Sequence, residues 1–380
     1  MKAKVIFVLY FLCLLSSKST AQISAFTTYQ NQFMVWQDGM VRKIDYLTPI
    51  SYKIGRMAMP YIDNSRSLKI YHGGGVTKIT DGLTSQYAAS DNLVTYQNAS
   101  LLSVWDRGKT TLLSRYCQQY YTGDSVVFFF EGVQKEFKAY YDGRVFPVES
   151  YLAAGNVDNL FDSVSTITNE MDIASGALPS IKVSDNIAAY INYANQFHAF
   201  FRGEIVPLED YTVASFDVGR NTVGYVDNMR QFKIFHDGQT TTIDNFPPLS
   251  YAVGDNVAAF VGYDNYFKIY YRDSVYNIGY FQPSFQVADN MVCFDDATGY
   301  FKVFYKGKIY TLENYYPANY TAAYNSVAYI NRAGVLRLFS EGNIYDVTNA
   351  DISDWRLDYD VVQYKFGGNM YKIFYQGKTY

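Results

Sequence analysis

The sequence is poor in the residues that most often carry out catalysis or bind metal ions. Among 380 residues there are three histidines and three cysteines. The motifs H-E-x-x-H, C-x-x-C and G-x-S-x-G, which mark zinc peptidases, thiol redox proteins and serine hydrolases, do not occur. We therefore assign no catalytic residue from the sequence, and we predict neither a cofactor nor a metal site.

Blocks of one charge are also missing. Lysine and arginine number 32 against 36 aspartates and glutamates, which gives a net charge of −4, and no cluster of basic residues stands out. Nucleic-acid-binding domains usually carry a basic patch or stripe. The sequence therefore predicts no nucleic-acid partner.

The chain has one long apolar run, near its N-terminus. Residues 5–15 are apolar, follow two lysines and lead into the small residues 19–21. A charged start, a short apolar stretch and small residues are typical of a secretory signal peptide, and the run is too short to span a bilayer. We predict a signal peptide at 1–22, no transmembrane segment, and an exported chain 23–380 in the periplasm or outside the cell.

Aromatic residues, in contrast, are abundant, and they recur at a fixed interval. The chain has 39 tyrosines and 27 phenylalanines. A large apolar residue is followed six positions later by glycine in nine copies, and a tenth copy carries Asp273 instead. Most copies are 34 or 35 residues apart, and the glycines are Gly39, Gly74, Gly108, Gly143, Gly203, Gly238, Gly307, Gly342 and Gly377. Such a period predicts a repeat architecture.

The seventh repeat reads as four short β-strands, called A to D. Strand A is expected at Tyr251–Gly254, strand B at Val257–Val261, strand C at Phe267–Tyr271 and strand D at Val275–Ile278, with Asp255-Asn256 as a tight turn. Helical periodicity is absent, and strands B and C are almost continuously apolar. Runs of this kind indicate strands that are covered on both faces.

The Asp-Asn turn, the V-A-F strand, the polar loop, the F-K-I-Y-Y strand and the glycine turn resemble the degenerate blades of WD40-like and TolB-type β-propellers. The resemblance covers the chain after the signal peptide and implies the fold, not an activity. We predict an all-β propeller of about ten four-stranded repeats of ~35 residues. Two smaller propellers, or an open array of β-repeats, are the alternatives. The chain is expected to begin in a strand B and end in a strand D, so that pairing between these incomplete ends could close the ring.

One interval is longer than the others. Gly143 and Gly203 are 60 residues apart, which places an insertion at about 153–180, between strand D of the fourth repeat and strand A of the fifth. In a propeller these connections leave the same face as the B–C loops. Insertions of this length are usually functional or passive loops, and we expect any binding surface on this face.

Acidic and aromatic residues recur beside these connections. An acid often follows the repeat glycine by six residues and an aromatic residue by eight, a pair that suits a sugar or a cation but that also suits packing between blades. Because the pair is periodic, packing is the better explanation for most copies. Next to the insertion, candidate ligand-binding residues are Glu149, Tyr151, Asp158, Asp162, Glu209 and Tyr211.

The sequence therefore favours an exported, non-enzymatic binding or scaffold protein with a protein or carbohydrate partner. The alternative is a glycan-active hydrolase or lyase that uses carboxylates on the face with the insertion.

Overall fold

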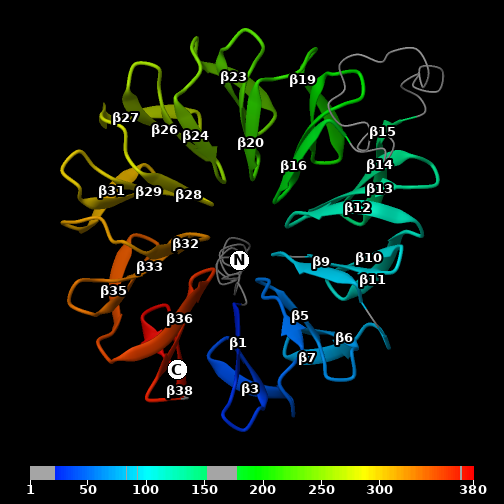
Figure 1. Cartoon of the computed structure of the whole chain (residues 1–380), viewed down its shortest axis with the longest axis vertical. Helices are drawn as coiled ribbons and strands as arrows, with labels where there is room; N and C mark the ends of the chain where they lie inside the picture. Colours follow the sequence, from blue (N-terminus) through cyan, green and yellow to red (C-terminus); the bar gives the residue numbers. More distant parts are fainter. Residues whose placement is uncertain (1–21, 83, 92, 152–177, 369) are drawn as a thin grey trace, which may run out of the picture.

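The computed structural model describes residues 22–82, 84–91, 93–151, 178–368 and 370–380. In this part of the chain ten separate antiparallel sheets follow one another around a central axis (Figure 1). We call the sheets blades I to X in chain order. Nine blades have four strands, named A to D from the axis outward, and blade I has three described strands that correspond to B, C and D.

Blades I to III consist of β1 (Ile23–Thr27), β2 (Phe33–Gln37), β3 (Met40–Asp45); β4 (Ser51–Tyr52), β5 (Ala58–Ile62), β6 (Leu68–His72), β7 (Gly75–Lys78); and β8 (Gln86–Ala89), β9 (Leu93–Asn98), β10 (Leu101–Asp106), β11 (Lys109–Ser114). Blades IV to VI consist of β12 (Cys117–Thr122), β13 (Val126–Glu131), β14 (Glu136–Tyr141), β15 (Arg144–Ser150); β16 (Ser180–Ser184), β17 (Ile187–Ile191), β18 (Phe197–Phe201), β19 (Glu204–Glu209); and β20 (Ser215–Gly219), β21 (Thr222–Val226), β22 (Phe232–His236), β23 (Gln239–Asp244).

Blades VII and VIII consist of β24 (Ser250–Val253), β25 (Val257–Val261), β26 (Tyr266–Tyr271), β27 (Ser274–Tyr280); and β28 (Phe285–Ala288), β29 (Met291–Asp295), β30 (Phe301–Tyr305), β31 (Lys308–Glu313). Blades IX and X consist of β32 (Tyr320–Ala323), β33 (Ser326–Ile330), β34 (Leu336–Ser340), β35 (Asn343–Thr348); and β36 (Ile352–Asp358), β37 (Val361–Phe366), β38 (Met370–Tyr375), β39 (Lys378–Thr379).

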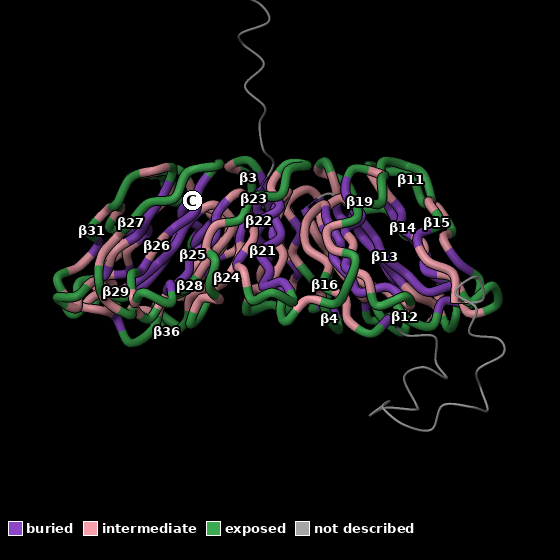
Figure 2. Tube along the Cα trace, turned by 90° about the horizontal axis from the view of Figure 1, so that it is seen from above, coloured by how far each residue is buried: buried purple, intermediate pink, exposed green. Residues whose placement is uncertain are grey.

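The strands predicted for the seventh repeat are confirmed in blade VII. β24 to β27 occupy the expected positions of strands A to D and differ from the predicted bounds by two residues or fewer at each end. All five residues of β25 are buried, whereas the outer strand β27 is mostly exposed. Figure 2, which views the disc from its edge, shows a second gradient, with buried strands at mid-height and exposed turns along the upper and lower rims. The aromatic runs of strands B and C therefore fill the layers between blades.

The ring is single and closed, so the alternatives of two propellers and of an open array are wrong. The chain ends meet through side chains of blades I and X. The ring of Trp36 lies 5.4 Å from those of both Tyr375 and Tyr380, and Phe26 stacks on Tyr371 at 5.2 Å. The expected pairing between the terminal strands does not occur among the described residues, because the two ends belong to different sheets.

A polar contact bridges the same seam, at the inner edge of blade I. Arg356 in β36 donates to the carbonyl oxygen of Ala25 and, at 2.8 Å, to the hydroxyl of Tyr52 in blade II. Gln363 donates to the same carbonyl of Ala25 at 3.1 Å. Because β1 has no strand A beside it among the described residues, these side chains supply donors that a neighbouring strand would otherwise provide.

Several predictions fall outside the described residues. They are the signal peptide 1–22 apart from Gln22, most of the insertion at 153–180, and the candidate ligands Asp158 and Asp162. Where the chain is described, it contains no helix long and apolar enough to cross a membrane.

Candidate functional site

The recurring acids at the ends of strands D make ion pairs between blades. Glu209 of blade V accepts hydrogen bonds from Lys233 of blade VI at 2.7 Å and from the hydroxyl of Tyr225 at 3.0 Å. Lys233 also contacts Asp227, in the B–C loop of its own blade, at 2.9 Å. Lys233 faces Tyr225 across strands B and C, so this blade places the cation beside the acid that ends strand D of the preceding blade.

The same arrangement recurs at other interfaces. Lys69 contacts Asp45 at 3.0 Å and Asp63 at 2.9 Å, and Arg337 contacts Glu313 at 2.8 Å. These contacts support the packing explanation for the periodic acids. They also account for Glu209 without a ligand, and Tyr211, which follows Glu209, is 42% exposed.

The interface between blades IV and V departs from this pattern. Glu149 occupies the acid's position, but His198 replaces the lysine and faces Tyr190 across the strands. Burial raises the pKa of Glu149 and lowers the pKa of His198. Within the described chain, the buried hydroxyl of Tyr190 and Nδ1 of His198 have no hydrogen-bond partner. Tyr151 packs edge-on against Tyr193, at 5.2 Å. The predicted pair Glu149 and Tyr151 therefore flanks an interface that lacks its cation.

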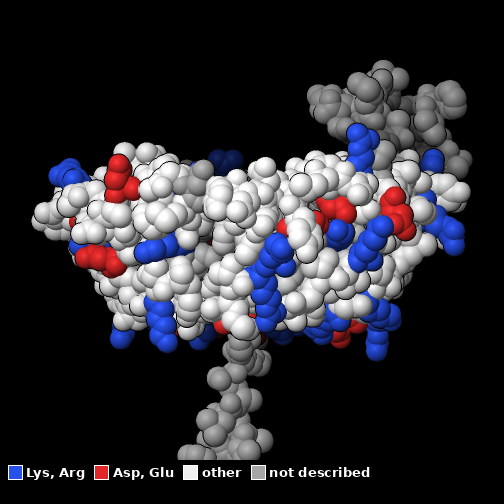
Figure 3. Space-filling model, turned by 90° about the horizontal axis from the view of Figure 1, so that it is seen from below, with Lys and Arg blue, Asp and Glu red and all other residues white. Residues whose placement is uncertain are grey.

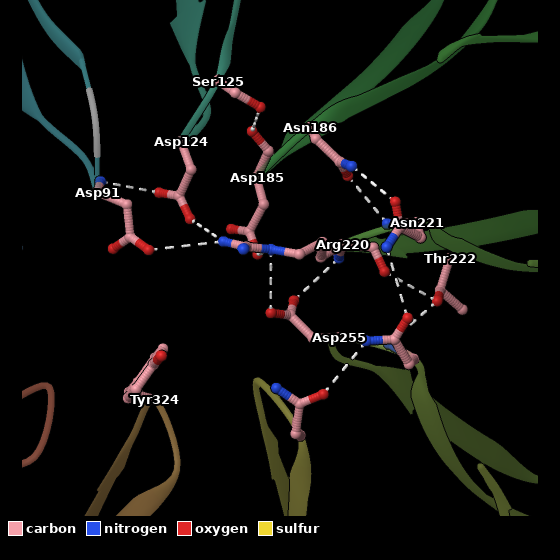
Figure 4. A network of polar contacts seen from close by, with 12 residues as sticks. Asp91, Asp124, Ser125, Asp185, Asn186, Arg220, Asn221, Thr222, Asp255 and Tyr324 are labelled. Carbon is pink, nitrogen blue, oxygen red and sulfur yellow. Dashed lines mark hydrogen bonds and ion pairs between the residues drawn. The ribbon is translucent and has the colours of Figure 1, made fainter. Parts of the chain in front are cut away.

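A second polar cluster lies on the axis, where the A–B turns converge (Figure 4). Arg220, in the turn of blade VI, contacts Asp185 at 3.0 Å, Asp255 at 3.3 Å, Asp91 at 3.6 Å and Asp124 at 2.5 Å. These four aspartates come from the corresponding turns of blades III, IV, V and VII. One guanidinium thus joins five blades at this end of the ring.

Arg220 and Arg56, which lies 3.7 Å from Asp91, are too few to neutralise so many carboxylates. Burial, together with the neighbouring aspartates, raises the pKa of Asp124 and of Asp255 despite the contact of each with Arg220. The pKa of Asp289, in the turn of blade VIII, is raised to about 6, chiefly by burial. Carboxyl groups that share a buried site hold protons that isolated carboxyl groups release. The axial cluster is therefore partly protonated near neutral pH.

The second residues of these turns form a chain of amide hydrogen bonds around the axis. The amide of Asn186 donates to Asn221 at 2.7 Å, that of Asn221 to Asn256 at 3.5 Å, and that of Asn256 to Asn290 at 3.2 Å. In the sequence, the Asp-Asn pairs indicated only tight turns. The sequence did not indicate that the side chains of these turns meet at the axis, because the turns are about 35 residues apart and share no local pattern.

Two recesses lie on the opposite face, which carries the D–A connections and the B–C loops. The larger has a volume of about 510 Å³ and is lined by Tyr315, Tyr316, Pro317, Ala318, Asn319, Ile330, Asn331, Arg332 and Trp355. The smaller, about 350 Å³, lies one blade earlier and includes Phe281, Asp296 and Lys302. The larger recess was not predicted, although Tyr315 belongs to the periodic aromatic residues.

Charged side chains of both signs are scattered over the outer side of the disc (Figure 3). Among the described residues, no group of three or more histidines, cysteines, aspartates and glutamates has the arrangement of a metal site. The two described cysteines, Cys117 and Cys293, are buried and unpaired. The polar clusters described above therefore serve mainly to join blades, and they are distinct from the residues that line the two recesses.

The chain belongs to the family of the 10-bladed beta propeller domain, which it matches over residues 17–380. The ten blades of the structure agree with this assignment. No curated protein matches the chain.

Solved propellers resemble it only distantly. The computationally designed Ika8 protein is 15% identical, with 76% of this chain and 95% of that chain covered and a TM-score of 0.32. PorZ, a surface component of the type-IX secretion system of Porphyromonas gingivalis, is 13% identical, with 77% and 44% covered and a TM-score of 0.30. Prp20p of Saccharomyces cerevisiae is 10% identical, with 67% and 81% covered and a TM-score of 0.31. At these values the similarity concerns the fold alone.

Proposed function

We propose that the protein is an exported, non-enzymatic binding or scaffold protein, and that it binds a protein or a glycan through the face with the D–A connections. The observation that carries this proposal is that the recurring polar residues bind to one another and hold the blades together. The recurring acids and lysines are paired between blades, and the axial aspartates surround Arg220. What the chain offers to a partner is a rigid ring with an aromatic recess on one face.

Two features support the choice of this face. It carries the connection from β15 to β16, where the sequence has its insertion, and it carries the larger recess. A ring of similar blades gains a local site only where its repetition is broken. The insertion and the larger recess are both places where the repetition is broken. Glu149 and Tyr151 lie next to the insertion.

The proposal is tested with the chain 23–380 and with a variant in which a short glycine-serine linker replaces residues 156–177. This variant keeps Leu178, which is buried in the core between blades IV and V. Both are applied to a glycan array and used for pull-down from the native extract. We expect the variant to melt within a few degrees of the parent, because the closure entropy of a loop depends only weakly on its length. It should lose most of its affinity for the partner found with the parent. Unchanged binding would place the site elsewhere, and unfolding would make the segment structural.

The rival function, a glycan-active hydrolase or lyase, is tested in the same preparation with a panel of glycosides. Such enzymes use a pair of carboxylates across the scissile bond. Turnover that copurifies with the protein and is lost in a Glu149→Gln variant would replace the binding proposal.

A further inference from the structure

The larger recess differs in charge from the smaller one, although both are built in the same way. In each, an Asx residue opens the B–C loop and its side-chain oxygen accepts two backbone hydrogen bonds. Asp296 does so from Thr298 and Tyr300, and Asn331 does so from Ala333 and Val335. The B–C loops that line the two recesses are therefore equivalent in blades VIII and IX, and their residues can be compared position by position.

Two substitutions make the recess of blade IX positive. Asn331 stands where blade VIII has Asp296, so a carboxylate is replaced by an amide. Arg332 stands where blade VIII has Ala297, so a guanidinium is added. In blade VIII, Lys302 is paired with Asp296 at 2.7 Å and the charge within the recess is balanced. In blade IX, the lining contains an arginine and no carboxylate.

Arg332 is held in place without an acid. Its guanidinium carbon lies 3.9 Å from the centre of the Tyr315 ring, and its backbone nitrogen donates to the Tyr315 hydroxyl at 2.7 Å. No carboxylate of the described chain forms an ion pair with it, whereas the nearby Arg337 contacts both Glu313 and Asp346. A guanidinium over an aromatic ring keeps its N–H groups available, and their fork matches a carboxylate.

The other lining residues supply flat apolar surfaces and hydrogen-bond donors. Tyr315 and Tyr316 are neighbours in the connection before β32, Trp355 belongs to β36 of blade X, and all three line the recess. The side-chain oxygen of Asn331 is used by the loop, so its NH₂ group is what this residue can offer to a ligand. A volume of about 510 Å³ lies in the range of sites for small ligands.

We propose that this recess, the Arg332 recess, binds an acidic saccharide, in which a sugar ring packs against Trp355 and the tyrosines while its carboxylate pairs with Arg332. This inference rests on the proposed binding function and adds the class of ligand. A neutral sugar would leave the guanidinium unpaired. An acidic peptide would satisfy Arg332 but would not use the flat surfaces around it.

Tryptophan fluorescence offers a direct readout. Of the three tryptophans, Trp36 is fully buried and Trp105 is 4% exposed, whereas Trp355 lines the recess. A ligand that enters the recess should therefore change the emission of Trp355. The chain 23–380 is titrated with an oligogalacturonate, with a neutral malto-oligosaccharide of the same length and with a short acidic peptide, and affinities are measured in parallel by calorimetry.

We expect saturable binding of the oligogalacturonate and at least about tenfold weaker binding of the neutral sugar and of the peptide. Arg332→Ala should weaken binding of the acidic sugar by about tenfold or more, the loss expected for a charged hydrogen-bonded contact. Trp355→Phe should remove the fluorescence signal while calorimetry still detects binding. Arg107→Ala, which removes an arginine that is 76% exposed on another blade, is the control and should bind like the parent.

The outcomes separate this inference from the proposed function. Equal binding of the neutral sugar, preference for the peptide, or unchanged binding by a folded Arg332→Ala variant would each overturn the acidic-sugar assignment. The absence of saccharide binding would overturn it too, while the array and pull-down with the 156–177 deletion would still decide whether the protein is a binding protein. Thermal melts of each variant verify that it is folded.

Discussion

At the scale of the residue, the C–D turns explain why glycine recurs. In blade VI the turn residues Asp237 and Gly238 have φ of 49° and 97°, and both lie between the paired strand residues His236 and Gln239. Positive φ at both positions defines the hairpin turn whose twist matches the strands, and glycine tolerates it best. Blade VII uses Asp273 at φ 65° instead, and there the aspartate accepts hydrogen bonds from the hydroxyl of Tyr270 and pairs with His236.

Replacement of Gly238 by valine should lower the free energy of unfolding by about 1–3 kcal/mol, because a β-branched residue is strained at this φ. A side chain at Gly238 would meet no atom within 4 Å, so the loss would report the backbone and not a clash. Gly75→Val is the matched control, since Gly75 is the first residue of the exposed strand β7 and has no positive φ. Denaturant-induced unfolding of the two variants measures the difference. Equal free energies of unfolding for Gly238→Val and Gly75→Val would refute the turn explanation.

At the scale of the element, several pairs of neighbouring blades are joined by a lysine or arginine of strand C and the acid that ends the preceding strand D. The pairs are partly buried, and charge-assisted hydrogen bonds of this kind are stronger than those between neutral groups. Between blades IV and V the pair is incomplete, because His198 stands in the lysine position and burial keeps its pKa low. The interface next to the insertion is therefore one of those that lack this ion pair, although its acid, Glu149, is present.

His198→Lys should restore this contact with Glu149 and raise the free energy of unfolding by about 1 kcal/mol. It should also lower the pKa of Glu149, which is raised by burial in the present interface. The control is the same change in a Glu149→Gln background, where the gain should disappear if the two residues interact. A gain that persists in that background would show that the lysine stabilises through other contacts.

At the scale of the whole molecule, the axial cluster ties blades that are far apart in the chain. Arg220 reaches Asp91 and Asp124 across 129 and 96 residues of sequence, and Arg56 of blade II donates to the hydroxyl of Tyr324 in blade IX at 2.8 Å. Because the blades themselves are separate sheets, contacts of this kind and the packed interfaces between neighbours hold the ring closed.

The cluster should make the stability of the ring depend on pH. The pKa values of Asp124, Asp255 and Asp289 are raised by burial above the value near 3.9 expected for an unfolded aspartate. The folded state therefore binds these protons more tightly, and their contribution to stability is complete below about pH 4 and is lost as the pH rises through the folded pKa values. For Asp289 that loss runs from about pH 4 to about pH 6, and for the other two it extends to higher pH.

We therefore expect the melting temperature to fall between pH 5 and pH 9. The free energy of unfolding should decrease by up to about 1.4 kcal/mol per pH unit for each proton that the folded state binds and the unfolded state has released. Asp255→Asn should flatten this dependence, because the amide does not ionise and its oxygen can still accept the hydrogen bond from the backbone nitrogen of Arg220. Asp81→Asn, at a side chain that is 88% exposed, should leave the profile unchanged. Parallel profiles for Asp255→Asn and the parent would exclude the axial carboxyl groups as the cause.

The sequence by itself determined the blades. The repeat glycines, the Asp-Asn turns and the apolar strands such as Val257–Val261 act over a few residues, and tight turns and covered strands leave a local pattern that can be recognised without a structure. The spacing from the repeat glycine likewise identified acids such as Glu149 and Glu209 at the ends of strands D.

Only the tertiary structure decided how the blades close and what their turns bring together. A single ring is chosen over two by packing such as that of Trp36 on Tyr375 and Tyr380, residues at opposite ends of the chain. The five-blade contact of Arg220 and the meeting of Tyr315, Arg332 and Trp355 in one recess also depend on how each blade is rotated about the axis. That rotation is the sum of packing at ten interfaces, so no local pattern in the sequence records it.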